Sequence, residues 1–197
     1  DTIFKENQIS IVFHAAAYKH VDLVEKNIFE SVKNNILGTE FICNVSYKYN
    51  VKNFILVSSD KAVRPTNFMG ATKRVSELIC QSYKANVKKT KFSIVRFGNV
   101  MGSSGSVIPK FEEQIKTGGP LTVTSKTVTR FFMTIQEAAQ LVIQSMSLAK
   151  GNDIFILDMG KPIKILELAK KMIFLKGFTP LLDENRENLN YKKGKNI

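Results

Sequence analysis

The chain has 197 residues, of which 44% are hydrophobic and 23% charged, a composition that suits one globular domain with a real core. No apolar run approaches the roughly 18 residues of a membrane span, so these residues offer no transmembrane segment. The formal charge of +12 favours anionic partners, but the lysines are spread along the chain, so we expect a solvated basic surface and no nucleic-acid site.

Short β-rich apolar runs alternate with amphipathic helical patterns along the chain. Thr134 followed by Glu137 three residues later is the capping-box pattern of a helix start. The patterns predict strands at residues 9–17, 51–59, 91–100, 120–124 and 153–160, and helices at 28–50, 66–86, 106–119, 134–150 and 164–177. The polar residues 181–197 are expected to form a tail without regular structure.

This alternation predicts an α/β fold with a parallel sheet. In such folds, ligands gather at the carboxyl ends of the strands. Three polar or glycine-rich segments follow the first three predicted strands: HAAAYKH (residues 14–20), SSDKAVRPTN (58–67) and GNVMGSSGSV (98–107). We therefore expect a ligand site at that edge of the sheet.

Cys43 and Cys80 are the two cysteines of the chain, and both fall within predicted helices. Two cysteines support neither a disulfide framework nor a metal site. His14 and His20 have no cysteine or carboxylate grouping around them. We expect no metal ion, and a reducing, cytoplasmic location.

Residues 57–74, VSSDKAVRPTNFMGATKR, hold a dense group of acids, bases and hydroxyls. Asp60 and Lys61 are adjacent, and Lys73 follows Met69 by four residues, so the latter two project from one helical face. The Met69 thioether can pack but cannot transfer a proton. Taken alone, the SSDK segment also fits a strand-end turn in which serine and aspartate bond to the backbone.

Seven motifs, in this order, carry a resemblance to a known family: FHAAA, NNILGT, SSDKAV, GATKR, RFGNVMGSSGSVIP, TRFFMT and FILDMG. The chain resembles the nucleotide-sugar 4,6-dehydratases of bacterial polysaccharide biosynthesis, within the extended short-chain dehydrogenase/reductase superfamily. It is most similar to the branch that acts on UDP-N-acetylglucosamine. The resemblance covers about residues 9–177 and implies a doubly wound, Rossmann-type parallel sheet within residues 1–180. Substrate-binding segments are implied at about 99–133 and 150–180.

The family opens with a glycine-rich turn that holds the cofactor pyrophosphate, whereas the first glycine here is Gly38. We therefore expect a partial Rossmann-type domain that lacks the first βαβ units and keeps part of the small substrate domain. The full-length parent is expected to be membrane-associated, on the cytoplasmic face of the inner membrane, and homo-oligomeric. The isolated chain is expected to have little or no activity.

The implied reaction is an internal redox elimination on UDP-N-acetylglucosamine with NADP or NAD. Hydride leaves C4 of the sugar, a base removes the C5 proton, water leaves from C6, and hydride returns to C6. By resemblance, Asp60 is the acid at the C6 oxygen and Lys61 the base at C5. Lys73 holds the nicotinamide ribose, and Met69 stands where the superfamily has a tyrosine. Ser59, a water or a neighbouring charged group then takes the C4 hydroxyl proton.

The resemblance also assigns binding residues, while Asn35 is interpreted as structural. Implied cofactor contacts are Ala15, Ala16, Ala17, Lys19, Ser58, Lys73, Phe97 and Gly98. Implied substrate contacts are Asn99, Ser106, Val107, Val123, Thr124 and Arg130.

Three alternatives stay open at this point. A nucleotide-sugar epimerase on the same fold would use C4 or C5 chemistry without net dehydration, although the Asp60-Lys61 pair argues against it. A non-catalytic nucleotide-binding module is favoured by Met69 and by the missing glycine-rich turn. In the third alternative, Met69 is an ordinary core residue and the site is inactive. The sequence does not choose between NAD and NADP.

Overall fold

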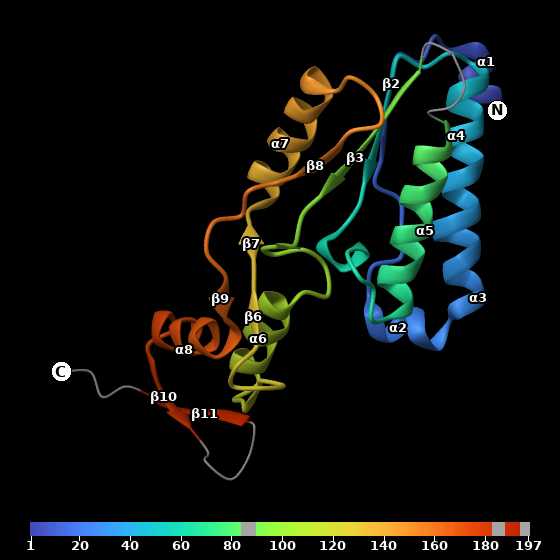
Figure 1. The fold of residues 1–197 in the computed structure, drawn as a ribbon. Helices are drawn as coiled ribbons and strands as arrows, with labels where there is room; N and C mark the ends of the chain where they lie inside the picture. Colours follow the sequence, from blue (N-terminus) through green and yellow to red (C-terminus); the bar gives the residue numbers. More distant parts are fainter. Residues whose placement is uncertain (84–89, 183–187, 194–197) are drawn as a thin grey trace. The chain divides into compact units, whose positions relative to one another are not determined.

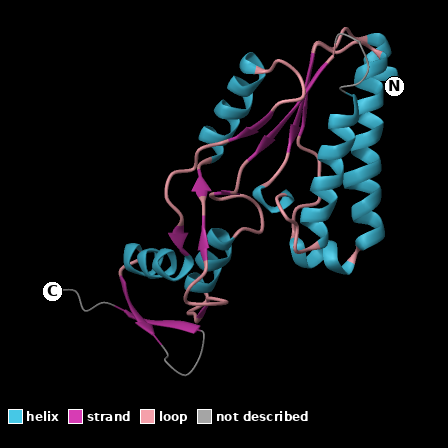
Figure 2. Ribbon diagram, viewed as in Figure 1, coloured by secondary structure: helices cyan, strands magenta, loops and turns pink. Residues whose placement is uncertain are grey.

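The structure, a computed structural model, describes residues 1–83, 90–182 and 188–193. The chain divides into two compact units, which are treated separately below (Figures 1 and 2). Unit 1 comprises Asp1–Phe97 and Ala138–Asp158, and unit 2 comprises Gly98–Glu137 and Met159–Ile197.

Unit 1 is built on a four-stranded sheet with the order β1-β2-β3-β8, and every neighbouring pair is parallel. Its strands are β1 (Ile11–His14), β2 (Asn53–Val57), β3 (Lys91–Arg96) and β8 (Ile154–Ile156). Its helices are α1 (Thr2–Glu6), α2 (Val21–Lys26), α3 (Ile28–Ser31), the π-helix η1 (Val32–Leu37), α4 (Gly38–Lys48), the 3-10 turn η2 (Asp60–Ala62), α5 (Phe68–Ser82) and most of α7 (Ile135–Leu148).

Alternate residues of the central strands pack on opposite faces of the sheet, as the two-residue period of a strand requires. On one face, Phe54 of β2 and Ile94 of β3 pack with Cys43 of α4 and Cys80 of α5. On the other face, a second cluster joins both strands to α7: Ile55, Val95 and Val142. Helices therefore cover both faces, which confirms the doubly wound α/β class (Figure 1).

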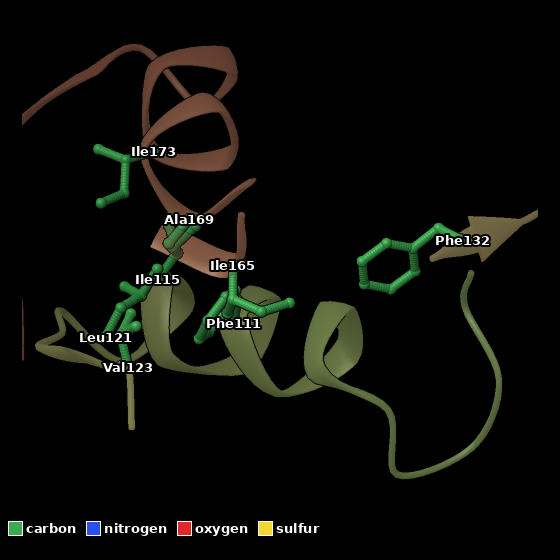
Figure 3. Close-up of a cluster of buried hydrophobic side chains, with 8 residues drawn as sticks. All are labelled: Phe111, Ile115, Leu121, Val123, Phe132, Ile165, Ala169 and Ile173. Atoms are coloured by element: carbon green, nitrogen blue, oxygen red, sulfur yellow. The ribbon is translucent and has the colours of Figure 1, made fainter. Parts of the chain in front are cut away.

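In the described residues, unit 2 contains β4 (Asn99–Val100), α6 (Val107–Lys116), β5 (Leu121–Thr122), β6 (Thr129–Arg130), β7 (Phe132–Met133), β9 (Ile163–Lys164), α8 (Ile165–Leu175), β10 (Phe178–Leu182) and β11 (Asn188–Lys193). It combines helices α6 and α8 with a three-stranded sheet, β10-β11-β5, and two strand pairs, β4-β7 and β6-β9. In its core, Phe111 and Ile115 of α6 pack with Ile165, Ala169 and Ile173 of α8 (Figure 3). This apolar contact between α6 and α8 forms the core of unit 2.

The capping box predicted at Thr134 and Glu137 is confirmed, and glycines mark the end of α6. At the start of α7, the Thr134 backbone N–H donates to Glu137 Oε2 at 2.8 Å, and the Glu137 backbone N–H donates to Thr134 Oγ1 at 3.1 Å. These are the two reciprocal bonds of a capping box. After α6, Gly118 and Gly119 take φ values of 94° and 79°, a left-handed backbone that ends the helix.

The structure corrects three predictions about elements. The helix expected over 28–50 is a run of α3, η1 and α4, because the backbone widens to a π-helix around Asn35. The strand expected over 91–100 divides, with β3 ending at Arg96 and β4 pairing instead with β7. The tail was expected to lack regular structure, but residues 188–193 form β11, whose backbone pairs with β10 and β5. Residues 183–187 and 194–197 lie outside the described residues.

Among the helices in the described ranges, none is long and apolar enough to cross a membrane.

Candidate active site

The turn after β2 brings an acid and a base into contact. Lys61 Nζ lies 3.0 Å from Asp60 Oδ1, and Ser59 Oγ donates to the same oxygen at 2.9 Å. Ser59 also caps the 3-10 turn, because its Oγ accepts from the Lys61 backbone N–H at 3.2 Å. The Asp60 and Lys61 side chains are 43% and 30% exposed, so a ligand can reach both. The segment is thus a capped strand-end turn and an accessible acid–base pair at once.

Helix α5 packs directly against this turn. It begins behind Asn67, whose Oδ1 accepts from the Gly70 backbone N–H at 2.8 Å. A Cβ on Gly70 would collide with the Lys61 carbonyl and would lie 3.2 Å from Pro65 Cβ. Only a glycine lets the helix backbone come this close to the turn. Gly70 therefore fixes the distance between the acid–base pair and α5.

Lys73 reaches from α5 to the end of β2, where its Nζ donates to the Val57 carbonyl at 2.9 Å. The side chain is buried, with 8% of its surface exposed. Burial lowers the pKa of Lys73 to about 8, against the opposing effect of the nearby Glu77 carboxylate. Met69 lies one turn earlier on the same helix and is also buried, with 3% exposed.

A buried carboxylate, Glu77, forms a network that the sequence analysis did not find. It is fully buried, and it accepts hydrogen bonds from residues of β3, of α5 and of the turn after β2. Arg96 binds both of its oxygens, at 2.7 and 2.6 Å, Arg74 NH1 lies 3.0 Å from Oε2, and Ser58 Oγ donates to Oε1 at 2.7 Å. Burial acts to raise the pKa of Glu77, but the bonds from Arg96, Ser58 and Arg74 outweigh it and lower the pKa.

A signal for Glu77 was present in the sequence. Met69, Lys73 and Glu77 follow one another at four-residue intervals, so they share one face of α5. A lysine and a glutamate on the buried face of a helix require partners, and that requirement points to an internal polar network.

Asn35 has the structural role that was expected of it. Its Oδ1 accepts from the Tyr18 backbone N–H at 2.7 Å, and its Nδ2 donates to the Tyr18 carbonyl and to Thr72 Oγ1, both at 3.0 Å. It thereby ties the segment after β1 to α5. The Nε2 atom of His14, at the end of β1, lies 3.0 Å from Thr39 Oγ1. Burial, with the nearby Lys73 cation, lowers the pKa of His14 to about 4.

The other residues expected at the cofactor follow the strands of unit 1. Ala15 and Ala16 are exposed and Ala17 is half-buried, directly after β1, and Lys19 is exposed in the same segment. Phe97 follows β3, and its carbonyl accepts from the Asp60 backbone N–H at 3.0 Å. The carboxyl ends of β1, β2 and β3 thus carry this group together.

The residues expected at the substrate lie in unit 2, as does Gly98, whose backbone N–H donates to Met159 Sδ at 2.9 Å. Ser106 precedes α6, and its buried Oγ has no hydrogen-bond partner. Arg130 is exposed, and its NH1 donates to the Thr129 carbonyl at 2.8 Å. The remaining positions are Asn99 in β4, Val107 at the start of α6, Val123 in the apolar core and Thr124, which is exposed.

In the described ranges, no cluster of three or more histidine, cysteine or acidic side chains is suited to a metal ion. Cys43 and Cys80 are both free and buried.

Fold and site together define an extended short-chain dehydrogenase/reductase: a doubly wound parallel sheet with polar chemistry at the strand ends and a buried lysine on the following helix. Within this class, the chain belongs to the family described as polysaccharide biosynthesis protein, whose profile matches residues 1–194.

Similar proteins include both dehydratases and epimerases of nucleotide sugars. The probable polysaccharide biosynthesis protein EpsC of Bacillus subtilis is 54% identical over 178 residues, which cover 90% of this chain and 30% of that protein. A UDP-N-acetylglucosamine 4,6-dehydratase (inverting) of Campylobacter jejuni is 37% identical over 82% of this chain and 49% of the enzyme. A UDP-glucose 4-epimerase of Rickettsia canadensis is 38% identical over 75% of this chain and 44% of the enzyme. The chain thus spans half or less of each of these relatives.

Two solved structures show the same fold. Pen from Bacillus thuringiensis is 44% identical, with a TM-score of 0.83 over 88% of this chain and 55% of Pen. A double mutant of DesIV, a dTDP-glucose 4,6-dehydratase from Streptomyces venezuelae solved with NAD bound, is 18% identical, with a TM-score of 0.83 over 89% of this chain and 60% of that one.

Proposed function

We propose that this protein is a UDP-N-acetylglucosamine 4,6-dehydratase, an NAD(P)-dependent hydro-lyase of bacterial polysaccharide biosynthesis. The observation that carries the proposal is the contact of Lys61 Nζ with Asp60 Oδ1 at 3.0 Å, in an accessible turn at the carboxyl end of β2. Elimination of water needs a base and an acid beside each other, whereas a 4-epimerase expels no water. The dehydratase relative from Campylobacter jejuni supports the substrate class.

Elimination requires the pair in two defined protonation states, with Lys61 as a neutral amine and Asp60 as a carboxylic acid. The Lys61 amine removes the proton from C5, and the Asp60 acid protonates the C6 hydroxyl, which leaves as water. The Lys61 ammonium formed in this way returns a proton to C5 at the end of the cycle. Ser59 is a candidate acceptor of the C4 hydroxyl proton, and its own proton then passes along its hydrogen bond to the Asp60 carboxylate. This supplies the Asp60 acid, so that no proton is gained or lost over the cycle.

The residues of unit 1 fit a nicotinamide cofactor, NAD or NADP. A bound nicotinamide would supply the hydride transfer from C4 and back to C6. The small, exposed Ala15 and Ala16 leave room after β1. Lys73 is assigned to the ribose hydroxyls, with Lys19, Ser58 and Phe97 as further contacts in unit 1; Gly98, the first residue of unit 2, is also assigned to the cofactor. Met69 packs beside this group and moves no proton.

Substrate recognition is assigned to unit 2. Arg130 offers a planar guanidinium for the diphosphate, and the buried, unpartnered Ser106 Oγ at the start of α6 offers a further hydrogen bond. Asn99 and Val107 are assigned to the sugar and diphosphate, and Val123 and Thr124 to the uracil. We also propose the domain division that the sequence predicts: residues 1–180 form a partial Rossmann-type domain that includes substrate-binding segments at about 99–133 and 150–180, and residues 181–197 are a polar tail.

We further propose that the full-length protein works in the cytoplasm, attached to the inner face of the membrane, as a homo-oligomer. The two free thiols, Cys43 and Cys80, support a reducing compartment. Self-association is supported by large hydrophobic side chains that remain exposed from α3 to α5: Phe29, Leu37, Phe41, Val75 and Leu78.

The test is the mass of the product formed by the natural full-length protein from UDP-N-acetylglucosamine and NAD(P)+. A product lighter than the substrate by one water supports the dehydratase. A product of unchanged mass would replace it with the second candidate, a nucleotide-sugar 4-epimerase, which the similarity to the Rickettsia enzyme favours. Binding of the nucleotide sugar without any turnover would favour a binding module instead.

A further inference from the structure

We propose that Glu77 is a positioning residue: through Ser58 and Arg96 it holds the Ser59-Asp60-Lys61 turn in its working geometry. In its effect on turnover, this inference rests on the function proposed above. It adds a residue that lies outside the acid–base pair and outside the assigned cofactor and substrate contacts.

Each donor to Glu77 is the chain neighbour of a residue assigned to the site. Ser58 precedes Ser59, Arg74 follows Lys73, and Arg96 precedes Phe97. The Glu77 carboxylate therefore joins the end of β2, the end of β3 and α5 at a single fully buried point. A change at Glu77 reaches all three segments without any contact to a ligand.

Hydrogen bonds to the end of β3 and to Glu77 fix the turn that carries Asp60 and Lys61. The Ser58 backbone N–H donates to the Val95 carbonyl at 2.8 Å, and the Asp60 backbone N–H donates to the Phe97 carbonyl at 3.0 Å. Between these two bonds, the Ser58 side chain is held by Glu77 Oε1. Arg96 lies between Val95 and Phe97 and binds both Glu77 oxygens. The Glu77 carboxylate thus binds a residue next to each side of the Asp60–Phe97 hydrogen bond: Ser58 on one segment and Arg96 on the other.

Fold stability alone does not require a charged hub at this point. Well-packed apolar residues often replace a buried ion pair without loss of stability. A bidentate arginine–carboxylate pair instead fixes direction as well as distance. This is the property needed to hold Asp60 and Lys61 in line with the C5 proton and the C6 oxygen.

The test uses the natural full-length protein with Ser58→Ala, which removes one hydrogen bond to Glu77 and leaves both arginine contacts. We expect kcat to fall by about 100-fold, the typical cost of a small misplacement of catalytic groups, with the KM for the sugar little changed. Exchange of the Asp60 backbone amide with solvent deuterium should become faster, while Phe54 to Leu56 in β2 exchange as before. A loss seen only in the KM for NAD(P)+ would overturn the inference, since the assigned cofactor contact of Ser58 would then explain the whole effect.

Ser93→Ala is the matched control, because Ser93, like Ser58, is a buried serine whose Oγ faces a carboxylate, at 3.5 Å from Asp153 Oδ2. It should leave kcat and Asp60 exchange at wild-type values. Wild-type kcat in Ser58→Ala overturns the inference. If wild-type protein does not dehydrate UDP-N-acetylglucosamine, the proposed function fails, and amide exchange alone decides the positioning role: unchanged exchange at Asp60 then overturns it.

Discussion

Three side chains on one face of α5 have different tasks in this account. Met69 packs in the core, whereas Lys73 is proposed to hold the cofactor and Glu77 is proposed to hold the turn. Adjacent Asp60 and Lys61 could be proposed from the sequence because neighbours in a turn stay close in any fold. The contacts of Glu77 with Ser58 and Arg96 could not be proposed in this way, since each of these residues lies 19 positions away, although Arg74 is a local partner three residues earlier. Only the pairing of β2 with β3 brings them together.

The first prediction concerns Met69. Because its thioether transfers no proton, Met69→Leu should keep turnover of the full-length enzyme within about threefold, as a volume-conserving core substitution usually does. Lys61→Met, by contrast, should abolish product formation. Steady-state assays of both variants check this. A Met69→Leu enzyme as inactive as Lys61→Met would show that the sulfur takes part in the site.

A second prediction follows from the burial of Lys73. Its pKa is about 8 in the folded protein and 10.5 for an ordinary lysine, so between these values the unfolded chain binds a proton that the folded chain does not. The free energy of unfolding therefore rises with pH over this range. Relative to Lys73→Met, the wild type should gain on the order of 2 kcal/mol between about pH 7 and pH 10. Urea denaturation at the two pH values measures the gain, and parallel changes in both proteins would contradict it.

Among the elements, the alternation of strands and helices could be predicted from the sequence, because the spacing of hydrophobic residues indicates the buried face of each strand or helix. The π-helix η1 was not, because the widening around Asn35 depends on partners at Tyr18 and Thr72 that are distant in sequence. Short elements such as α1 and β6 are too brief to show a period. Strand β11 is fixed by backbone pairing with β10 and β5, which side-chain polarity does not reveal.

The contact of α5 with the turn gives a third prediction. Gly70→Ala should gain about 1 kcal/mol in helix propensity but lose more, about 1–3 kcal/mol, because the new methyl group meets the Lys61 backbone. The free energy of unfolding and kcat should both fall. Gly38→Ala is the control, since its Cβ would lie 3.8 Å from the Lys33 carbonyl, an ordinary contact. If Gly70→Ala matches the control in both measurements, the close approach has no role.

At the scale of the whole molecule, the proposed self-association gives a fourth prediction. Phe41 is 59% exposed on α4, and a charge there should disfavour burial between copies. Phe41→Glu should therefore lower the mass of the natural protein in light scattering. The control is Ile143→Glu, at a residue 55% exposed on α7, which should leave the mass unchanged. Equal masses for wild type and Phe41→Glu would remove this face from the proposal.

The central claim is that Asp60 and Lys61 expel water from a UDP-sugar, and it is tested most directly by turnover in D2O. The full-length protein is incubated with UDP-N-acetylglucosamine and NAD(P)+ in D2O, and the product is examined by NMR and mass spectrometry. Because the Lys61 ammonium exchanges its protons with solvent, the account predicts a product that has lost one water and carries deuterium at C5, and no such product from Lys61→Met. A product of unchanged mass, or a Lys61→Met enzyme that still dehydrates the sugar, would contradict it.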